Sequence, residues 1–267
     1  MNRAVIAFGS IAFVGLFVSL AQAQAPASSD DNLTAQQIVT AADQVRNPGK
    51  PFRLTSTLTE YIGGQAKDQV VLVIYVREDQ TTKAYSNLVR YAAPPRDAGK
   101  LVLLSASNLW FYDPSSKASV RLSPQQRLTG QASDGDVLTV NYSRDYTATL
   151  VGRETLQDAE RKNCDCWHLD LKAATPDAVY NRVEYWVERG TYRSVKAKFY
   201  ADSGRLLKIA YFDKNQDLLG GVRPTETILI DAVDSNLVTT IASSDYRFQE
   251  IPDAWFQRDY LPRLKDE

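Results

Sequence analysis

The chain has 267 residues, of which 31 are basic and 32 acidic, giving a net charge of −1 at pH 7. This balance gives no electrostatic reason to expect nucleic acid or an anionic membrane surface as a partner. The 2 cysteines cannot supply the disulfide framework of a small secreted domain, so a hydrophobic core must stabilise the fold.

The N-terminus has the composition of an export signal. Residues 1–25 read MNRAVIAFGSIAFVGLFVSLAQAQA, with a basic start, an apolar run and then alternating small residues. This order is typical of a secretory signal peptide, with cleavage expected after Ala23 or Ala25. No later stretch reaches the ~20 apolar residues that a membrane span requires, so we expect no membrane span in the mature chain.

The domain organisation follows from this signal. We expect residues 1–23 to be the signal peptide, residues 24–32 a flexible leader, and residues 33–267 a single domain. A chain of this size is large enough to bury a substantial core. The periplasm is the predicted location.

The domain is predicted to begin with an amphipathic helix over residues 33–46. Thr34 stands at the N-cap and Gln37 follows three residues later, which is a capping box. One helical face carries Ile38, Ala41, Ala42 and Val45. The sequence Asn-Pro-Gly at residues 47–49 ends the helix.

Strand patterns follow along nearly all the rest of the chain. They are short runs rich in β-branched and aromatic residues, separated by turn residues. The predicted strands lie in residues 52–62, 70–76, 83–94, 100–105, 108–114, 118–124, 146–154, 166–172, 181–188, 194–202, 205–213, 225–233 and 236–243. Residues 202–204 and 213–217 are predicted to be hairpin connections. The class is mainly β (α+β), with strands in up-and-down order in one long antiparallel sheet that curls upon itself.

Two segments do not fit this pattern. Residues 124–145 could form a helical turn followed by a long loop, and loops of that length are usually functional or mobile. The closing segment, residues 251–264, is predicted to be a short helix or hooked tail that docks on the body through its aromatic residues.

Residues 163–171, NCDCWHLDL, hold both cysteines and the only histidine. A zinc site needs about four converging ligands, and one strand with alternate residues ~6.6 Å apart cannot wrap a metal by itself. Redox exchange favours C-x-x-C at a helix N-terminus. A disulfide between Cys164 and Cys166 would bend the strand. We expect no metal site, and a strand end whose thiols are incidental and exposed or partly covered.

The opposite face of the same strand is the more informative one. Trp167, Leu169 and Leu171 alternate with the cysteines and are predicted to point to the interior. The chain has no nucleophile elbow and no glycine spacing for phosphate binding. The sequence therefore indicates no active site and no cofactor, and we expect a protein that is not an enzyme.

A series of motifs resembles a known family. NLWFYDPSSKASVRLSP, residues 108–124, carries a W-x-Y-x-P strand and turn followed by a basic strand. A glycine and acidic insert comes next, and then a Tyr-x-x-V-x-x-W-V strand and a Phe-Tyr-x-x-x-Gly hairpin in residues 180–204. Over residues 34–245 this order is similar to that of the bacterial outer-membrane lipoprotein-sorting proteins of the LolA/LolB-like superfamily. Asp113 and the insert SDGDVLT depart from the family's usual residues.

The resemblance implies an unclosed antiparallel β-barrel of about eleven strands, lidded by an N-terminal helix and a short helical insert. Such proteins bind a lipid or the acyl chains of a lipoprotein and move them across the periplasm. The branch that this chain resembles is often associated with inner-membrane transporters of the resistance-nodulation-division type. A carrier between such a transporter and the outer membrane is the function that the resemblance implies.

The strands supply apolar faces for such a cavity, where each buried CH₂ group of an acyl chain would contribute ~0.8 kcal/mol. The candidate lining residues are Leu54, Leu58, Ile74, Trp110, Tyr112, Trp167, Leu169, Tyr185, Phe199, Ile209, Tyr211 and Ile228. Residues 124–145 are predicted to be the cover, whose mobility gates the cavity.

Two other classes stay open. A periplasmic binding or scaffold protein, accessory to a membrane transporter, would use the sheet edge or convex face and carry no lipid. A thiol-dependent redox protein, which is less favoured, would use Cys164 and Cys166. A bound adduct of lipid size distinguishes the carrier from both.

Overall fold

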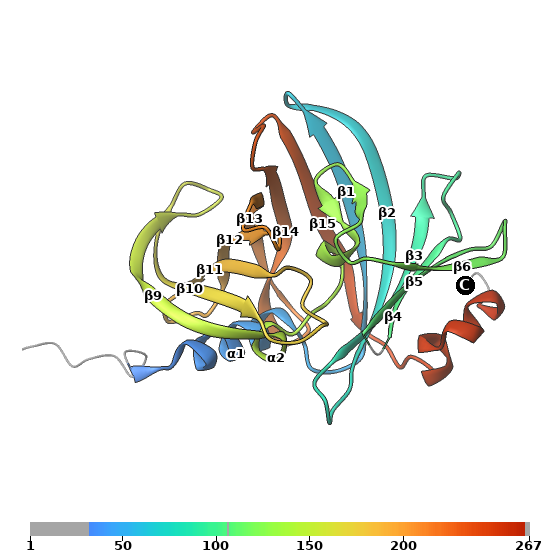
Figure 1. Ribbon diagram of the computed structural model, residues 1–267, viewed down its shortest axis with the longest axis horizontal. Helices are drawn as coiled ribbons and strands as arrows, with labels where there is room; N and C mark the ends of the chain where they lie inside the picture. Colours follow the sequence, from blue (N-terminus) through green and yellow to red (C-terminus); the bar gives the residue numbers. More distant parts are fainter. Residues whose placement is uncertain (1–31, 106, 265–267) are drawn as a thin grey trace, which may run out of the picture.

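The computed structural model describes residues 32–105 and 107–264 (Figure 1). The predicted signal peptide and the leader up to residue 31 lie outside the described residues. Helix α1, Ala35–Arg46, begins with the predicted capping box: Thr34 Oγ1 accepts from Gln37 N at 3.3 Å, and Thr34 N donates to Gln37 Oε1 at 2.8 Å. Asn47 is the C-cap, as the sequence predicts.

One antiparallel sheet of thirteen strands makes up most of the described chain. Its first half comprises β1 (Phe52–Ile62), β2 (Gln65–Glu78), β3 (Tyr85–Ala93), β4 (Leu101–Ser105), β5 (Asn108–Asp113) and β6 (Ala118–Leu122). Its second half comprises β9 (Tyr146–Gln157), β10 (Asn163–Ala173), β11 (Arg182–Glu188), β12 (Ser194–Tyr200), β13 (Leu206–Leu218), β14 (Gly221–Asp231) and β15 (Leu237–Phe248).

The strand order shows how the sheet curls without closing. It runs β6-β5-β4-β3-β2-β1-β15-β14-β13-β12-β11-β10-β9, so β1 and β15 join the two halves and β6 and β9 are free edges. Register shifts occur between β1 and β15, between β2 and β3, and between β10 and β9. Such bulges bend a strand and increase its twist. Figure 1 shows the curved sheet, with the edge strand β9 at the left of the molecule and the edge strand β6 at the right.

The segment between the two free edges crosses the concave side of the sheet. It contains a small hairpin, β7 (Arg127–Thr129) and β8 (Ala132–Ser133), a 3₁₀ turn Asp134–Asp136, and helix α2, Tyr142–Asp145. Because the chain must pass from β6 to β9, its connection has to cross the open side. We call residues 124–145 the cover.

Two hydrophobic layers lie on opposite faces of the sheet. The main core fills the concave side and includes Ile38 of α1, Trp167 of β10 and Tyr185 of β11. A second cluster lies on the convex side, where the C-terminal 3₁₀ turns, Asp253–Phe256 and Arg258–Arg263, pack Phe256 and Leu261 against β2 to β5. The tail therefore docks on the body, as predicted.

Two details of the sequence-based prediction differ from the structure. The family resemblance implies about eleven strands, whereas the described residues form thirteen in the main sheet. Residues 213–217 were predicted to be a hairpin connection, but β13 runs through them to Leu218 and the chain turns at Leu219 and Gly220. This polar stretch pairs with β14, from Asp213 opposite Glu226 to Leu218 opposite Gly221, so it extends the hairpin beyond the core.

Candidate functional site

A cavity of about 170 Å³ lies between the concave face and the cover. The sheet contributes inward-facing residues of β1 and of β12 to β15, the cover contributes residues 135–140 and Tyr142, and α1 contributes its last turn. The lining includes Leu54, Ser56, Phe199, Ala210, Phe212, Thr227, Leu229, Ile241, Ser243, Tyr246, Arg46 and Asn47. Aromatic and aliphatic side chains predominate among the strand residues.

The volume limits what fits in this form of the molecule. An apolar cavity of about 150 Å³ holds a ligand the size of benzene, and sites for larger ligands occupy about 300–1,000 Å³. At about 170 Å³, this cavity admits only part of an acyl chain. Binding a whole chain would require the cover to move away from the sheet.

A buried charged cluster fastens the cover to β13. Lys208, whose side chain is 7% exposed, forms an ion pair with Asp136 of the cover and donates to the Gln131 carbonyl at 3.0 Å. Tyr180 donates to the other Asp136 oxygen at 2.6 Å and contacts Ser133 Oγ at 2.9 Å. A buried ion pair is stable only when such hydrogen bonds satisfy both groups, so this contact favours one position of the cover.

Asp134 lies beside this cluster and is 4% exposed. Burial, and then the nearby charge of Asp136, raise the pKa of Asp134 to about 7. The cover thus carries a carboxyl group that changes charge near neutral pH.

Asn87 of β3 holds the middle of the cover from the other half of the sheet. Its Nδ2 donates to the Thr139 carbonyl at 3.0 Å, and its Oδ1 accepts from Thr139 N at 2.9 Å. Asn87 is fully buried. The paired bonds resemble one step of a β-ladder and link the cover to β3 as well as to β13.

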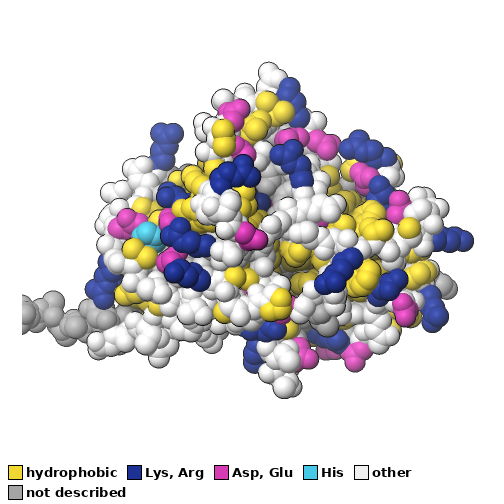
Figure 2. Space-filling view, in the orientation of Figure 1, with side chains coloured by type: hydrophobic (Ala, Val, Ile, Leu, Met, Phe, Trp, Pro, Cys, Tyr) yellow, Lys and Arg dark blue, Asp and Glu magenta, His cyan; other side chains and the backbone are white. Residues whose placement is uncertain are grey.

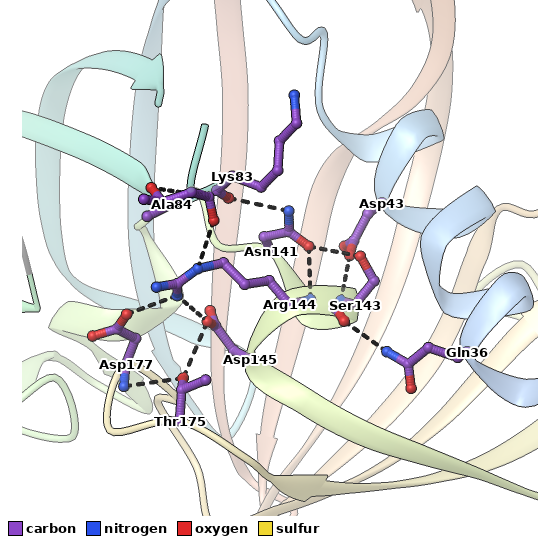
Figure 3. A network of polar contacts seen from close by, with 11 residues as sticks. Gln36, Asp43, Lys83, Ala84, Asn141, Ser143, Arg144, Asp145, Thr175 and Asp177 are labelled. Carbon is purple, nitrogen blue, oxygen red and sulfur yellow. Dashed lines mark hydrogen bonds and ion pairs between the residues drawn. The ribbon is translucent and has the colours of Figure 1, made fainter. Parts of the chain in front are cut away.

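Helix α2, at the end of the cover, lies in a polar network that Figure 3 shows. Asp43 of α1 accepts from Ser143 N at 2.6 Å, and Gln36 donates to the Ser143 carbonyl at 2.6 Å. Arg144 donates to the Thr82 carbonyl at 3.0 Å and pairs with Asp177 at 2.7 Å. The network ties α2 to α1, to the β2–β3 turn and to the loop after β10, so this end of the cover is fixed at three points.

Two glycines allow the cover to approach closely. A Cβ on Gly135 would lie 2.3 Å from Val179 Cγ1 and 2.9 Å from the Pro124 carbonyl oxygen. Gly130 has a φ of +50°, and a Cβ there would lie 2.3 Å from Thr239 Oγ1. Any larger residue at either position would have to displace its neighbours.

The structure places seven of the twelve predicted lining residues in the concave core: Leu54, Leu58, Ile74, Trp167, Leu169, Tyr185 and Phe199. Of these, Leu54 and Phe199 line the cavity itself. The other five lie deeper in the packed core, where larger movements would be needed to expose them. Contact of these residues with a ligand stays a prediction.

Five predicted lining residues lie on the other face. Trp110 and Tyr112 belong to the convex cluster beneath the C-terminal tail. Ile209, Tyr211 and Ile228 share the convex face with Lys196 and Lys198, because Tyr211 lies opposite both Lys196 and Ile228. Their placement corrects the prediction. These strands are apolar on both faces, so alternation alone could not identify the inward one.

The cysteine-histidine segment also lies partly on the convex face. Cys164 and Cys166 are free and buried against Trp186 and Val195. Burial raises the pKa of the Cys166 thiol to about 12, which disfavours the reactive thiolate. His168 stacks on Trp186 with ring centroids 4.3 Å apart. Figure 2 shows histidine at the surface of this face among acidic and basic side chains.

The described residues contain no group of three or more His, Cys, Asp or Glu side chains placed to hold a metal ion. Among the same residues, no helix has the length and apolar character needed to cross a membrane.

Sequence reasoning missed the residues that hold the cover in place. Lys208, Asn87, Asp136 and Tyr180 are far apart in the sequence and meet only in the folded sheet. Lys208 did leave a signal, since it interrupts the apolar run of its strand, LLKIAYF. However, because Ile209 and Tyr211 were predicted to face inward, the sequence placed Lys208 on the outward face, where a charge needs no buried partner.

Known proteins have similar sequences and structures. A family model described only as an uncharacterised protein family matches residues 83–263. A LolA superfamily protein from Nitrosomonas europaea is 31% identical, with a TM-score of 0.76 over 85% of this chain and 99% of that one. The chain belongs to the LolA superfamily. No curated protein matches its sequence.

Two more distant structures share the LolA-like fold. A DUF1329 family protein from Desulfovibrio piger is 20% identical, with a TM-score of 0.72 over 85% of this chain and 97% of that one. A putative outer membrane lipoprotein-sorting protein domain from Vibrio parahaemolyticus is 18% identical, with a TM-score of 0.70 over 86% and 98%. These similarities support the LolA-like fold of the sheet.

Proposed function

We propose that this LolA superfamily member is a periplasmic carrier that binds a lipid, or the acyl chains of a lipoprotein, between its concave face and its cover. It would move this cargo between an inner-membrane transporter and the outer membrane. The observation that carries the proposal is the small cavity beneath the cover, whose sheet wall is mainly apolar, together with the few polar contacts that hold the cover. Membership of the superfamily and the predicted signal peptide support the periplasmic location.

The contacts of the cover would allow it to open and close over the cavity. The cover is fastened to β13 through Lys208 and to β3 through Asn87, while α2 is fixed by its own network. Releasing the first two contacts would free the middle of the cover and leave its end anchored at α2. An acyl chain could then extend from the cavity along the apolar concave face.

Native mass spectrometry of the protein purified from its host tests this proposal. A bound mass of lipid size is expected, and it would identify the cargo. An adduct-free spectrum under gentle conditions favours the alternative, a scaffold protein accessory to a membrane transporter that carries no lipid.

A pair of variants locates the adduct. Thr227 lines the cavity, whereas Ile228, the next residue of β14, faces the convex side. Thr227→Trp fills the cavity and is expected to abolish the adduct, and Ile228→Trp adds the same bulk outside it and is expected to keep the adduct. Equal loading of the two variants would contradict a cargo site beneath the cover.

A further inference from the structure

An arginine cluster lies on the convex face, outside the proposed cargo site. Arg53 of β1 and Arg247 of β15 are directly opposite each other in the β1–β15 register. Arg90 of β3 faces the same side, because it lies opposite Val73, and Val73 and Tyr75 are the outward-facing residues of β2 there. The three arginines line one open pocket of about 530 Å³.

The Arg53–Arg247 pair of this cluster is unfavourable when the pocket is empty. Residues directly opposite in neighbouring strands have Cβ atoms about 4.5–5.5 Å apart, and like charges in such positions destabilise a sheet. Within the described part of the chain, neither Arg53 nor Arg247 forms an ion pair or a side-chain hydrogen bond. Asp245, two residues before Arg247, lies in the bulge of β15 with a φ of 53° and pairs with neither arginine.

The described residues around the pocket do not neutralise the repulsion between Arg53 and Arg247. Arg77, further along the outward face of β2, has an acidic partner in Asp253 of the C-terminal tail. The remaining pocket lining, which includes Val73, Tyr75 and Gly99, contains no acidic residue. Among the described residues, Asp253 thus neutralises Arg77, whereas the Arg53–Arg247 pair has no acidic partner.

We propose that this pocket binds a phosphate ester group. Guanidinium groups present planar pairs of donors that match phosphate oxygens, and an anion between Arg53 and Arg247 would convert their repulsion into attraction. Ordinary ligand sites occupy about 300–1,000 Å³, so the pocket admits a substituted phosphate as well as the bare ion. The ester is either the headgroup of an anionic phospholipid or a soluble organic phosphate.

This site is independent of the proposed cargo, because the curved sheet separates it from the cavity. With a lipid headgroup as its ligand, it would hold the convex face against a membrane surface. The net charge of the whole chain, −1 at pH 7, does not reveal this site, because acidic residues elsewhere in the chain balance the clustered arginines.

Two binding experiments with the full mature chain distinguish the two sources of phosphate. The first is co-sedimentation with phosphatidylcholine vesicles that do or do not contain phosphatidylglycerol. The second is thermal unfolding with and without glycerol 1-phosphate. The variants are Arg53→Gln with Arg247→Gln, and Arg205→Gln, which removes an exposed arginine from the β12–β13 hairpin as a control.

Each basic group near an anionic membrane contributes about 1 kcal/mol, so the double variant is expected to bind phosphatidylglycerol vesicles roughly 30-fold more weakly than wild type. A headgroup site gives this loss, with Arg205→Gln reduced fivefold or less. A site for a soluble ester gives instead a rise in melting temperature with glycerol 1-phosphate that the double variant lacks. The proposal is overturned if wild type and the double variant behave alike in both experiments.

The same variants separate this inference from the carrier proposal. Thr227→Trp should lose its cargo adduct and keep vesicle or ester binding, whereas the double arginine variant should show the reverse. Unfolding of each variant in buffer alone checks that it is folded. Removing Arg247 should raise the melting temperature, because its repulsion with Arg53 is then absent. Such a rise would show that the two arginines do not serve to stabilise the fold.

Discussion

Replacing Asp134 by Asn should make the stability of the protein less dependent on pH. Burial beneath the cover and the charge of Asp136 raise the pKa of Asp134 to about 7, and the pKa in an unfolded chain is about 3.9. Between these two values the folded state keeps a proton that the unfolded state has lost. The stabilisation is therefore complete below about pH 4 and is lost as the pH rises to 7.

The size of the effect follows from the shift. Each pKa unit corresponds to about 1.4 kcal/mol, and roughly two of the units lie between pH 5 and the folded pKa. Wild type should therefore lose about 3 kcal/mol more than Asp134→Asn between pH 5 and pH 8. Asn has nearly the shape of Asp and carries no charge, so it removes the titration without leaving a cavity.

Urea unfolding of both proteins at pH 5 and pH 8 measures this difference. Asp202→Asn, an exposed position in the β12–β13 hairpin, is the control and should follow wild type. If Asp134→Asn and wild type lose the same free energy of unfolding between the two pH values, then Asp134 is solvated and the cover does not bury it. Hydrogen exchange of residues 134–142 would then also be fast at both pH values.

Two further predictions concern the closeness and charge of the cover. Gly135→Ala should destabilise the protein by about 1–3 kcal/mol and speed hydrogen exchange in the cover, because the alanine Cβ would lie 2.3 Å from Val179. Gly152→Ala is the control: no atom lies within 4 Å of its Cβ, so neither the free energy of unfolding nor the exchange rate should change. Lys208→Met should lower the free energy of unfolding by about 3–5 kcal/mol, because the Asp136 charge stays buried without its partner, and adding Asp136→Leu should restore most of it in urea unfolding. Equal stabilities of the single and double variants would show that Asp136 finds another partner or water.

The sequence predicts the positions of the helix and strands well, but it predicts poorly which face of each strand points inward. The capping box at Thr34 and Gln37 sets the start of α1, and alternation with turn residues locates every strand of the main sheet, because both signals are local. Ala210 illustrates the failure. It lines the cavity, while its larger neighbours Ile209 and Tyr211 point outward, so hydrophobicity favoured the wrong face.

The site depends on register, which a single sequence does not contain. Lys208 meets Asp136, and Asn87 meets Thr139, across 72 and 52 residues of chain. Arg53 and Arg247 become opposite neighbours only once β1 pairs with β15. Strand pairing is set by the summed packing of the whole sheet, so neither the contacts of the cover nor the arginine pocket could be read from local patterns.

The position of the cover between β6 and β9 has a mechanical consequence. It is the covalent link between the two halves of the sheet on the open side, while on the other side β1 and β15 pair along the length of β1. A proteolytic cut in the cover would therefore leave two fragments joined by a full ladder of backbone hydrogen bonds. The open side of the sheet, which the cover crosses, is therefore separate from the side where β1 pairs with β15. Displacing the cover would leave the backbone hydrogen bonds between β1 and β15 intact.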